Sequence, residues 1–193
     1  MYFVGDINDQ SAEQFSKALL IMSIERQYNR SLPITVYINS GGGAVGAGLA
    51  MMQMMDEVRR RYGVKIDTVI TGYAYSMGAI VFQAGDHRTM GIYSTMMLHS
   101  SSWMLSGEDE KIFEDYAKLA QHNRRIVAEL FHQRTGVRTV RWWEKFIYSG
   151  HDRFLAAPEC LKLGLVDEVP GLNSPPPESP THGVAVGAPT AKA

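Results

Sequence analysis

The amino-acid sequence predicts an α/β fold with a mainly parallel sheet and crossover helices. Three short apolar segments, at residues 34–38, 65–70 and 95–98, are expected to be strands. The first two each lead into a glycine-containing turn and then into residues with helical spacing. Strands that alternate with helices favour a parallel sheet with right-handed crossovers.

The elements before residue 65 follow this pattern. Residues 2–4 are expected to end a strand, and Asp9 or Ser11 to cap the helix that follows it. The strand at residues 34–38 runs into an Asn-Ser-Gly-Gly-Gly turn, and a helix is predicted from about Ala44 to about Arg61.

The later elements repeat the order of strand, turn and helix. Residues 72–78 are expected to turn the second strand into a short apolar helix that ends near Gly85. The third strand ends at His99, at the carboxyl edge of the predicted sheet. Residues 152–169 are expected to supply a short strand, a helix and a last strand at residues 165–166.

The longest predicted helix covers residues 108–135, with Ser106 as its cap and Gly136 at its end. Its apolar residues are spaced alternately by four and three, as in a coiled-coil seam. At ~1.5 Å per residue it reaches roughly 40 Å, about the breadth of a domain of this size. We therefore expect part of this helix to project and pack on another subunit, with an ordinary core helix as the alternative.

Composition predicts one packed domain, residues 1–169, followed by a disordered tail, residues 170–193. The chain is 45% hydrophobic and 20% charged, as is ordinary for a globular domain. The tail is rich in Pro, Gly, Ser, Ala and Thr and lacks Phe, Trp and Tyr.

The charge balance gives no support to nucleic acid as a partner, because 19 Lys and Arg face 20 Asp and Glu without any block of one sign. No apolar stretch has the roughly 20 residues that cross a bilayer, and the N-terminus has no secretion signal. The single cysteine, Cys160, excludes an internal disulfide and a Cys-based zinc site. A cytoplasmic protein is the prediction, with Cys160 as a small buried side chain.

Ser76 is the candidate nucleophile. It lies where a strand meets a helix and is flanked by small residues, so its hydroxyl is expected at a helix N-terminus. The segment is not a G-x-S-x-G elbow, and a lone serine at such a place is usually only a helix cap. A catalytic serine also needs an adjacent base.

His99 is the favoured base among the six histidines. It lies at the edge of the sheet where open α/β folds bind ligands and where Ser76 also emerges. The other candidate, His151, directly precedes Asp152. Because consecutive residues of a strand point to opposite sides, His151 and Asp152 cannot both face one site. Asp152 is the candidate that orients the base. A satisfied strand-end histidine and a solvated turn aspartate are the alternatives.

Backbone amides for an oxyanion are expected from two turns. The glycine turn at residues 41–43 can provide one, and the amide of Met77 the other. A phosphate cradle is the competing interpretation of the glycine turn, but the G-x-x-x-x-G-K-[ST] pattern is absent.

Taken in order, four segments resemble motifs of the proteolytic subunit of the Clp protease. Residues 37–43, YINSGGG, resemble its Y-I-N-S-P-G-G turn, and residues 74–79, AYSMGA, resemble its A-A-S-M-G-A nucleophile segment. Residues 97–99, MLH, are similar to its M-I-H strand end, and residues 152–167 are similar to its last motif. The likeness extends from about Phe3 to Val169.

By position, the resemblance implies Ser76, His99 and Asp152 as a catalytic triad, with the amides of Gly43 and Met77 as oxyanion donors. It also implies a cleft that holds an extended polypeptide by strand-like backbone hydrogen bonds. The residues that would border this cleft are Gly42, Ala44, Val45, Ser100, Ser101 and Ser102.

The resemblance implies the ClpP/crotonase-like fold and a serine endopeptidase that needs no cofactor or metal. Its substrates would be unfolded proteins or short peptides, cleaved inside a chamber made by two stacked seven-membered rings. The long helix would be the handle through which the rings meet, and an AAA+ unfoldase would feed the chamber. A phage-type head maturation peptidase, a catalytically silent ring subunit and a crotonase-type acyl-CoA enzyme are the alternatives.

The sequence departs from the family at several positions. Gly41 replaces a proline, and Ser100 replaces the usual glutamine. Tyr75 replaces a small residue beside the nucleophile and is expected to narrow or reshape the pocket. His151 stands where an arginine involved in ring contacts is common, and the likeness begins without the pore-lining segment that precedes the family's first strand. The last difference and the altered cleft motivate the phage-type alternative.

Overall fold

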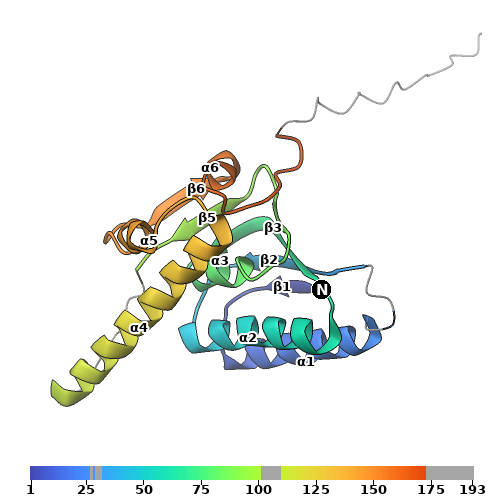
Figure 1. Ribbon diagram of the computed structural model, residues 1–193, viewed down its shortest axis with the longest axis horizontal. Helices are drawn as coiled ribbons and strands as arrows, with labels where there is room; N and C mark the ends of the chain where they lie inside the picture. Colours follow the sequence, from blue (N-terminus) through green and yellow to red (C-terminus); the bar gives the residue numbers. More distant parts are fainter. Residues whose placement is uncertain (27, 29–31, 101–109, 173–193) are drawn as a thin grey trace, which may run out of the picture.

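The computed structural model describes residues 1–26, 28, 32–100 and 110–172. Within these residues, six strands form one sheet in the order β1-β2-β3-β5-β6, with β4 paired to the first half of β3 (Figure 1). Every pair is parallel except β5 with β6, so the predicted α/β fold with a mainly parallel sheet is confirmed. The predicted tail falls mostly outside the described residues and stays a prediction. The strands are Tyr2–Val4 (β1), Ile34–Ser40 (β2), Ile66–Tyr75 (β3), Arg88–Met90 (β4), Thr95–Leu98 (β5) and Arg153–Ala156 (β6).

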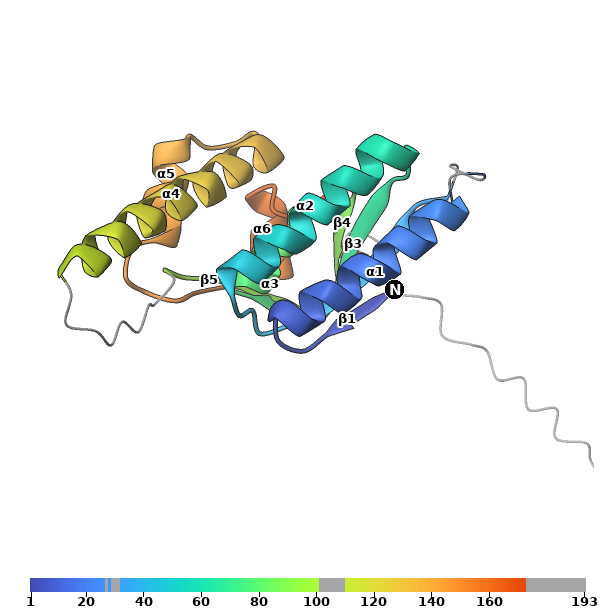
Figure 2. The ribbon, with the colours of Figure 1, turned by 90° about the horizontal axis from the view of Figure 1, so that it is seen from below.

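Helices complete the core. The two longest of the N-terminal half, α1 and α2, lie side by side along the sheet (Figures 1 and 2). Strand β2 alternates buried with half-buried side chains, as expected for a strand that packs its more apolar face against helices. The helices are Asp9–Arg26 (α1), Val45–Tyr62 (α2), Met77–Phe82 (α3), Glu110–Thr135 (α4), Val140–Ile147 (α5) and Ala157–Lys162 (α6).

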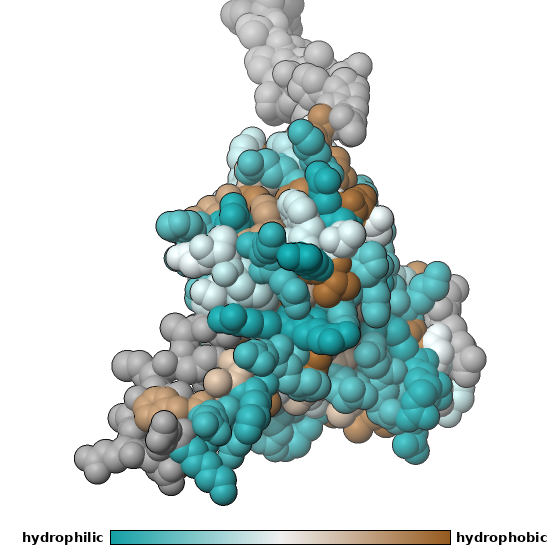
Figure 3. Space-filling model, turned by 60° about the vertical axis from the view of Figure 1, so that its left-hand side comes forward, coloured by the Kyte–Doolittle hydropathy of each residue, from teal (hydrophilic) through white to brown (hydrophobic). Residues whose placement is uncertain are grey.

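Helix α4 stands away from the sheet over its first turns (Figure 1). Residues 111–119 are exposed, whereas Val127, Ala128 and Phe131 near its other end are buried in the core. This is the projecting helix that the sequence predicts; its expected start at residue 108 and its cap, Ser106, lie outside the described residues. On the face seen in Figure 3 the surface is largely hydrophilic, with apolar residues in small separate groups.

Strand β3 continues past Gly72 to Tyr75, so the turn predicted at residues 72–78 is wrong for its first four residues. The reason is a contact with β2, whose register with β3 shifts between Ile38 and Ser40. At this irregularity the Asn39 side chain accepts a hydrogen bond from Tyr73 N at 3.1 Å. A Cβ on Gly72 would lie 2.7 Å from Asn39 Oδ1, so glycine serves here to admit a side chain rather than to turn the chain.

Two other elements differ from expectation. The strand predicted at residues 165–166 is wrong: Leu165 and Val166 are buried core residues, and the segment joins the sheet only at a bridge between Thr89 and Glu168. Helix α5, capped by the side chain of Thr139, is absent from the prediction, as is the three-residue strand β4.

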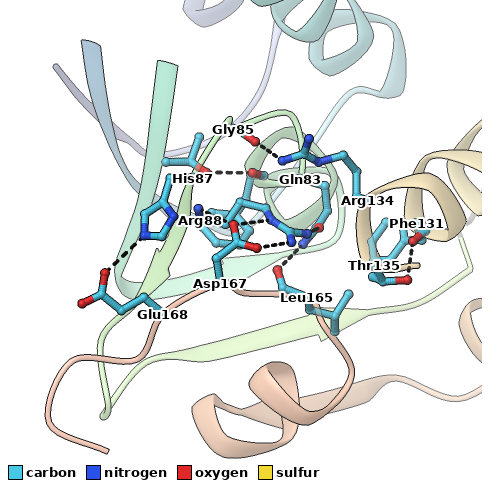
Figure 4. Close-up of polar contacts among 12 residues, drawn as sticks. Gln83, Gly85, His87, Arg88, Phe131, Arg134, Thr135, Leu165, Asp167 and Glu168 are labelled. Atoms are coloured by element: carbon cyan, nitrogen blue, oxygen red, sulfur yellow. Dashed lines mark hydrogen bonds and ion pairs between the residues drawn. The ribbon is translucent and has the colours of Figure 1, made fainter. Parts of the chain in front are cut away.

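A buried polar cluster ties the end of α3 to β4 and to the segment after α6 (Figure 4). The guanidinium of Arg88 donates to Asp167 at 2.6 Å and 3.0 Å and to Gln83 Oε1 at 2.5 Å. Gln83 in turn donates to the carbonyl of Leu165 at 2.9 Å. Arg134 of α4 reaches the carbonyl of Gly85, so three segments distant in the sequence, residues 83–88, Arg134 and residues 165–167, meet at this cluster. Because Arg88 and Gln83 are buried, each needs these partners.

Replacing Asp167 with Asn should destabilise the protein by about 1–3 kcal/mol at neutral pH, because the buried Arg88 loses a charged acceptor. Burial acts to raise the pKa of Asp167, but the hydrogen bonds and charge of Arg88 outweigh it and lower that pKa. The stabilisation is therefore complete above about pH 4, where unfolded aspartate is ionised, and is lost as pH falls through the lower folded pKa. Urea unfolding of the wild-type protein and of Asp167→Asn, from pH 7 to pH 2.5, measures the difference between their free energies of unfolding. A difference that does not shrink in acid would contradict the role of the ionised Asp167.

Candidate active site

Ser76 joins β3 to α3 in a strained conformation. Its φ is 53° and its ψ is −123°, and within the described ranges it is the one non-glycine residue with a positive φ. Such a conformation costs on the order of 1–3 kcal/mol and is concentrated at functional sites. The Ser76 side chain makes no capping hydrogen bond to α3, so the interpretation of this serine as a helix cap does not hold.

The Ser76 hydroxyl contacts His99 instead. His99 follows the last residue of β5, and its Nε2 lies 2.7 Å from Ser76 Oγ. The ends of the two strands are joined by a hydrogen bond of 2.8 Å from Ser76 N to the carbonyl of Met97. Parallel pairing of β3 with β5 thus brings two residues 23 positions apart into direct contact.

Asp152 reaches His99 through the antiparallel pairing of β5 and β6. Leu98 is opposite Arg153 in the register. Because the strands are antiparallel, the residue after Leu98, His99, is opposite the residue before Arg153, Asp152. Asp152 Oδ1 lies 3.6 Å from His99 Nδ1, and the Asp152 side chain is 57% exposed. The three residues that the sequence selects therefore lie in one row, with Asp152 the least enclosed.

Two other histidines contact groups outside this row. His87 Nε2 lies 3.2 Å from Glu168 Oε2, and His132 Nδ1 lies 2.5 Å from the carbonyl of Arg138. His151 is exposed. Among the described residues, no three His, Cys, Asp or Glu side chains are grouped as ligands of a metal ion would be.

The glycine turn packs directly on the nucleophile. A Cβ on Gly42 would lie 2.7 Å from Ser76 Cβ and 3.0 Å from Met77 N, and one on Gly43 would lie 2.1 Å from the carbonyl oxygen of Ile7. Their φ values of 97° and 143° also favour glycine. No side chain fits at either position, so the backbone of this turn borders Ser76.

Hydrogen bonds on both sides of Gly43 hold the turn in place. Gly42 N donates to Ser40 Oγ at 3.1 Å, Ile7 N donates to Gly42 O at 2.7 Å, and Ala44 N donates to Ile7 O at 2.8 Å. In the part of the chain that the structure describes, the N–H groups of Gly43 and Met77 have no hydrogen-bond partner. Both are amides that the sequence selects as oxyanion donors.

A small cavity of about 30 Å³ opens beside Ser76 and His99. Val45 lines it, as expected of a cleft residue, whereas Ala44 does not and Ser100 only follows His99 in the chain. Ser101 and Ser102 lie outside the described residues. Tyr75 is not in the lining, so it does not narrow this cavity. The lining residues are Val45, Ser76, Met77, Ile80, His99, Asn123, Val127 and Tyr148.

Two polar residues of this cavity were not predicted as part of the site. Asn123 is a polar residue in the middle of α4 and lines the cavity. Tyr148 follows α5, a helix that was not predicted from the sequence. Burial raises the pKa of Tyr148 to about 12, despite the nearby charge of Arg124, whose guanidinium lies 4.9 Å from the ring centroid. Tyr148 is therefore a neutral hydroxyl at the cavity wall.

The single cysteine takes no part in this site. Cys160 is fully buried in α6, as predicted, and its burial raises the pKa of the thiol to about 12. None of the described helices has the length and apolar character needed to cross a membrane.

Comparison with known proteins assigns the family. The Clp protease family model matches residues 1–172. An ATP-dependent Clp protease proteolytic subunit from Chlorella vulgaris is 28% identical over 171 residues, which cover 88% of this chain and 80% of the algal protein. The match spans the sheet, the glycine turn and the row of Ser76, His99 and Asp152. The chain belongs to the Clp protease family.

Proposed function

We propose that the protein is a serine endopeptidase in which Ser76 is the nucleophile, His99 the base and Asp152 the group that orients the base. The observation that carries this proposal is the 2.7 Å contact between His99 Nε2 and the hydroxyl of Ser76, a residue that has a strained backbone and whose side chain does not cap α3. A serine hydroxyl becomes an effective nucleophile only when such a base removes its proton.

The reaction follows from these positions. Ser76 Oγ attacks the peptide carbonyl while His99 Nε2 takes its proton, and the resulting oxyanion accepts hydrogen bonds from the amides of Gly43 and Met77. His99 then gives the proton to the leaving amine, and an acyl-enzyme remains on Ser76. Water, deprotonated by His99, attacks this ester, and the acid product leaves as Ser76 regains its proton.

Asp152 stabilises the charged form of His99 in this cycle. The 3.6 Å separation between Nδ1 and Oδ1 is longer than a hydrogen bond. When His99 takes the proton, its attraction to the carboxylate increases, and we expect the two groups to approach one another, since catalytic contacts often tighten only in the reacting complex.

The substrate is an extended polypeptide. The side-chain-free backbone at Gly42 and Gly43 leaves room for a strand-like partner beside Ser76, with Ala44 and Val45 continuing this edge. Ser100 directly follows His99 in the chain. The cavity of about 30 Å³, walled partly by Val45 and Val127, accepts a small apolar side chain next to the scissile bond.

The protein assembles through the projecting part of α4 into two stacked seven-membered rings that enclose the active sites. The exposed apolar residues on that part support this proposal, because a helix with such a face is stable when another subunit covers it. The algal relative is called the proteolytic subunit of an ATP-dependent protease, which supports an AAA+ unfoldase as the partner that supplies unfolded chains. The exposed residues are Ile112, Phe113, Tyr116 and Leu119.

A fluorophosphonate probe should label Ser76 in the wild-type protein, and the Ser76→Ala variant should remain unlabelled. Asp152→Asn should slow the labelling by about a thousandfold or more, because the base loses its orienting charge. Intact-mass measurement over time and peptide mapping provide the rates and the site. His87→Gln is the matched control and should label at the wild-type rate. Labelling of another residue would refute the assignment.

Native mass spectrometry should find the mass of two seven-membered rings of 21.5 kDa chains. Replacing both Phe113 and Leu119 with Asp should release smaller species, because two charges then enter the apolar contact. Tyr93→Asp, at a residue 98% exposed in a loop, is the control and should leave the mass unchanged. A wild-type protein with the mass of a single chain would contradict the proposed chamber. An intact assembly that the fluorophosphonate never labels would favour the alternative of a catalytically silent ring subunit.

A further inference from the structure

Tyr75 directly precedes the nucleophile, and its side chain contacts both strands that carry the other two site residues. Its hydroxyl lies 2.8 Å from Thr95 Oγ1 of β5. Its ring meets the ring of Phe154 of β6 edge to face, with centroids 5.6 Å apart and planes at 89°. The centroid of the Tyr73 ring lies 4.9 Å from that of Tyr75. Tyr75 therefore links β3 to β5 and to β6 by side-chain contacts.

These contacts follow from the register of the sheet. Tyr75 is opposite Met97 of β5, and Met97 is opposite Phe154 of β6, so the three residues form one row across the strands. Their neighbours Ala74 and Leu155 are buried in the core, which places Tyr75 and Phe154 on the other face of the sheet. The aromatic contact thus spans β5 and joins two strands that share no backbone hydrogen bonds.

The row lies next to the catalytic groups in the sequence. Ser76 directly follows Tyr75, His99 is two residues after Met97, and Asp152 is two residues before Phe154. Strand β6 has only four residues and lies at the end of the strand order. Asp152, which is more than half exposed, lies 3.6 Å from His99 Nδ1. The placement of β6 relative to β5 thus determines how Asp152 meets His99, and Tyr75 of β3 contacts side chains of both strands.

We propose that Tyr75 is a positioning residue that holds Asp152 against His99 by fixing β6 through Phe154 and β5 through Thr95. This inference rests on the proposed role of the three catalytic residues. It gives a function to the bulky side chain that stands where the family has a small one: the tyrosine braces the three strands instead of shaping the substrate cavity.

Tyr75→Ala should slow fluorophosphonate labelling of Ser76 by roughly 10- to 100-fold, the cost of a misplaced catalytic group. Tyr75→Phe should lose less, because it keeps the ring contact with Phe154 and gives up only the hydroxyl contact with Thr95. Phe154→Ala removes the same contact from the other strand and should match Tyr75→Ala; since Phe154 is 59% exposed, this truncation spares the core. Tyr93→Ala is the control and should label normally.

The decisive comparison is made in the Asp152→Asn background. If Tyr75 acts by positioning Asp152, adding Tyr75→Ala to Asp152→Asn should cause little further loss, because the two changes remove the same interaction. An equal loss in both backgrounds would show a merely structural role and overturn the inference. So would wild-type labelling rates in Tyr75→Ala and Phe154→Ala. Failure of the wild-type protein to label at Ser76 would instead refute the proposed function itself.

Discussion

The strained backbone of Ser76 is the constraint on which the arrangement of the site depends. At a φ of 53°, the chain leaves β3 sharply enough that the serine hydroxyl faces His99 instead of capping α3. The turn that packs against Ser76 has glycine at positions 42 and 43, because any Cβ there would collide with Ser76 or with Ile7. Strain at one residue is thus maintained by close packing from a turn on the neighbouring strand.

The sheet provides the second half of the arrangement. Parallel pairing of β3 and β5 sets Ser76 beside His99, and antiparallel pairing of β5 and β6 sets Asp152 beside His99. The antiparallel direction of β6 matters, because Asp152 directly precedes this strand. If β6 ran parallel to β5, Asp152 would lie at the opposite edge of the sheet from His99. The Arg88 cluster fastens the other end of α3, so the helix that begins after Ser76 is held at both ends.

Much of this arrangement could be predicted from the sequence, for identifiable reasons. Ser76 and His99 each follow an apolar strand, and the carboxyl ends of parallel strands share an edge, so their proximity could be inferred from order alone. Asp152 could be selected from its flanking residues and the family resemblance. Its position opposite His99, however, depends on the register between β5 and β6, which the residues around Asp152 do not encode.

The differences arise where a distant contact overrides a local signal. Gly72 has the local character of a turn, yet it lies inside β3 because the Asn39 side chain needs the space. Asn123 and Tyr148 reach the cavity only because α4 and α5 pack over it. The role of Tyr75 could not be predicted either, since it depends on a partner 79 positions away that the sheet brings into contact.

The proposed mechanism depends on activation of Ser76 by the imidazole of His99, which chemical rescue can measure. A His99→Gly variant should lose nearly all labelling of Ser76 by a fluorophosphonate, and added imidazole should restore part of the rate as it occupies the vacated space. The rescued rate should rise with imidazole concentration and with pH, because the neutral ring is the base. Undiminished labelling in His99→Gly without imidazole would contradict it.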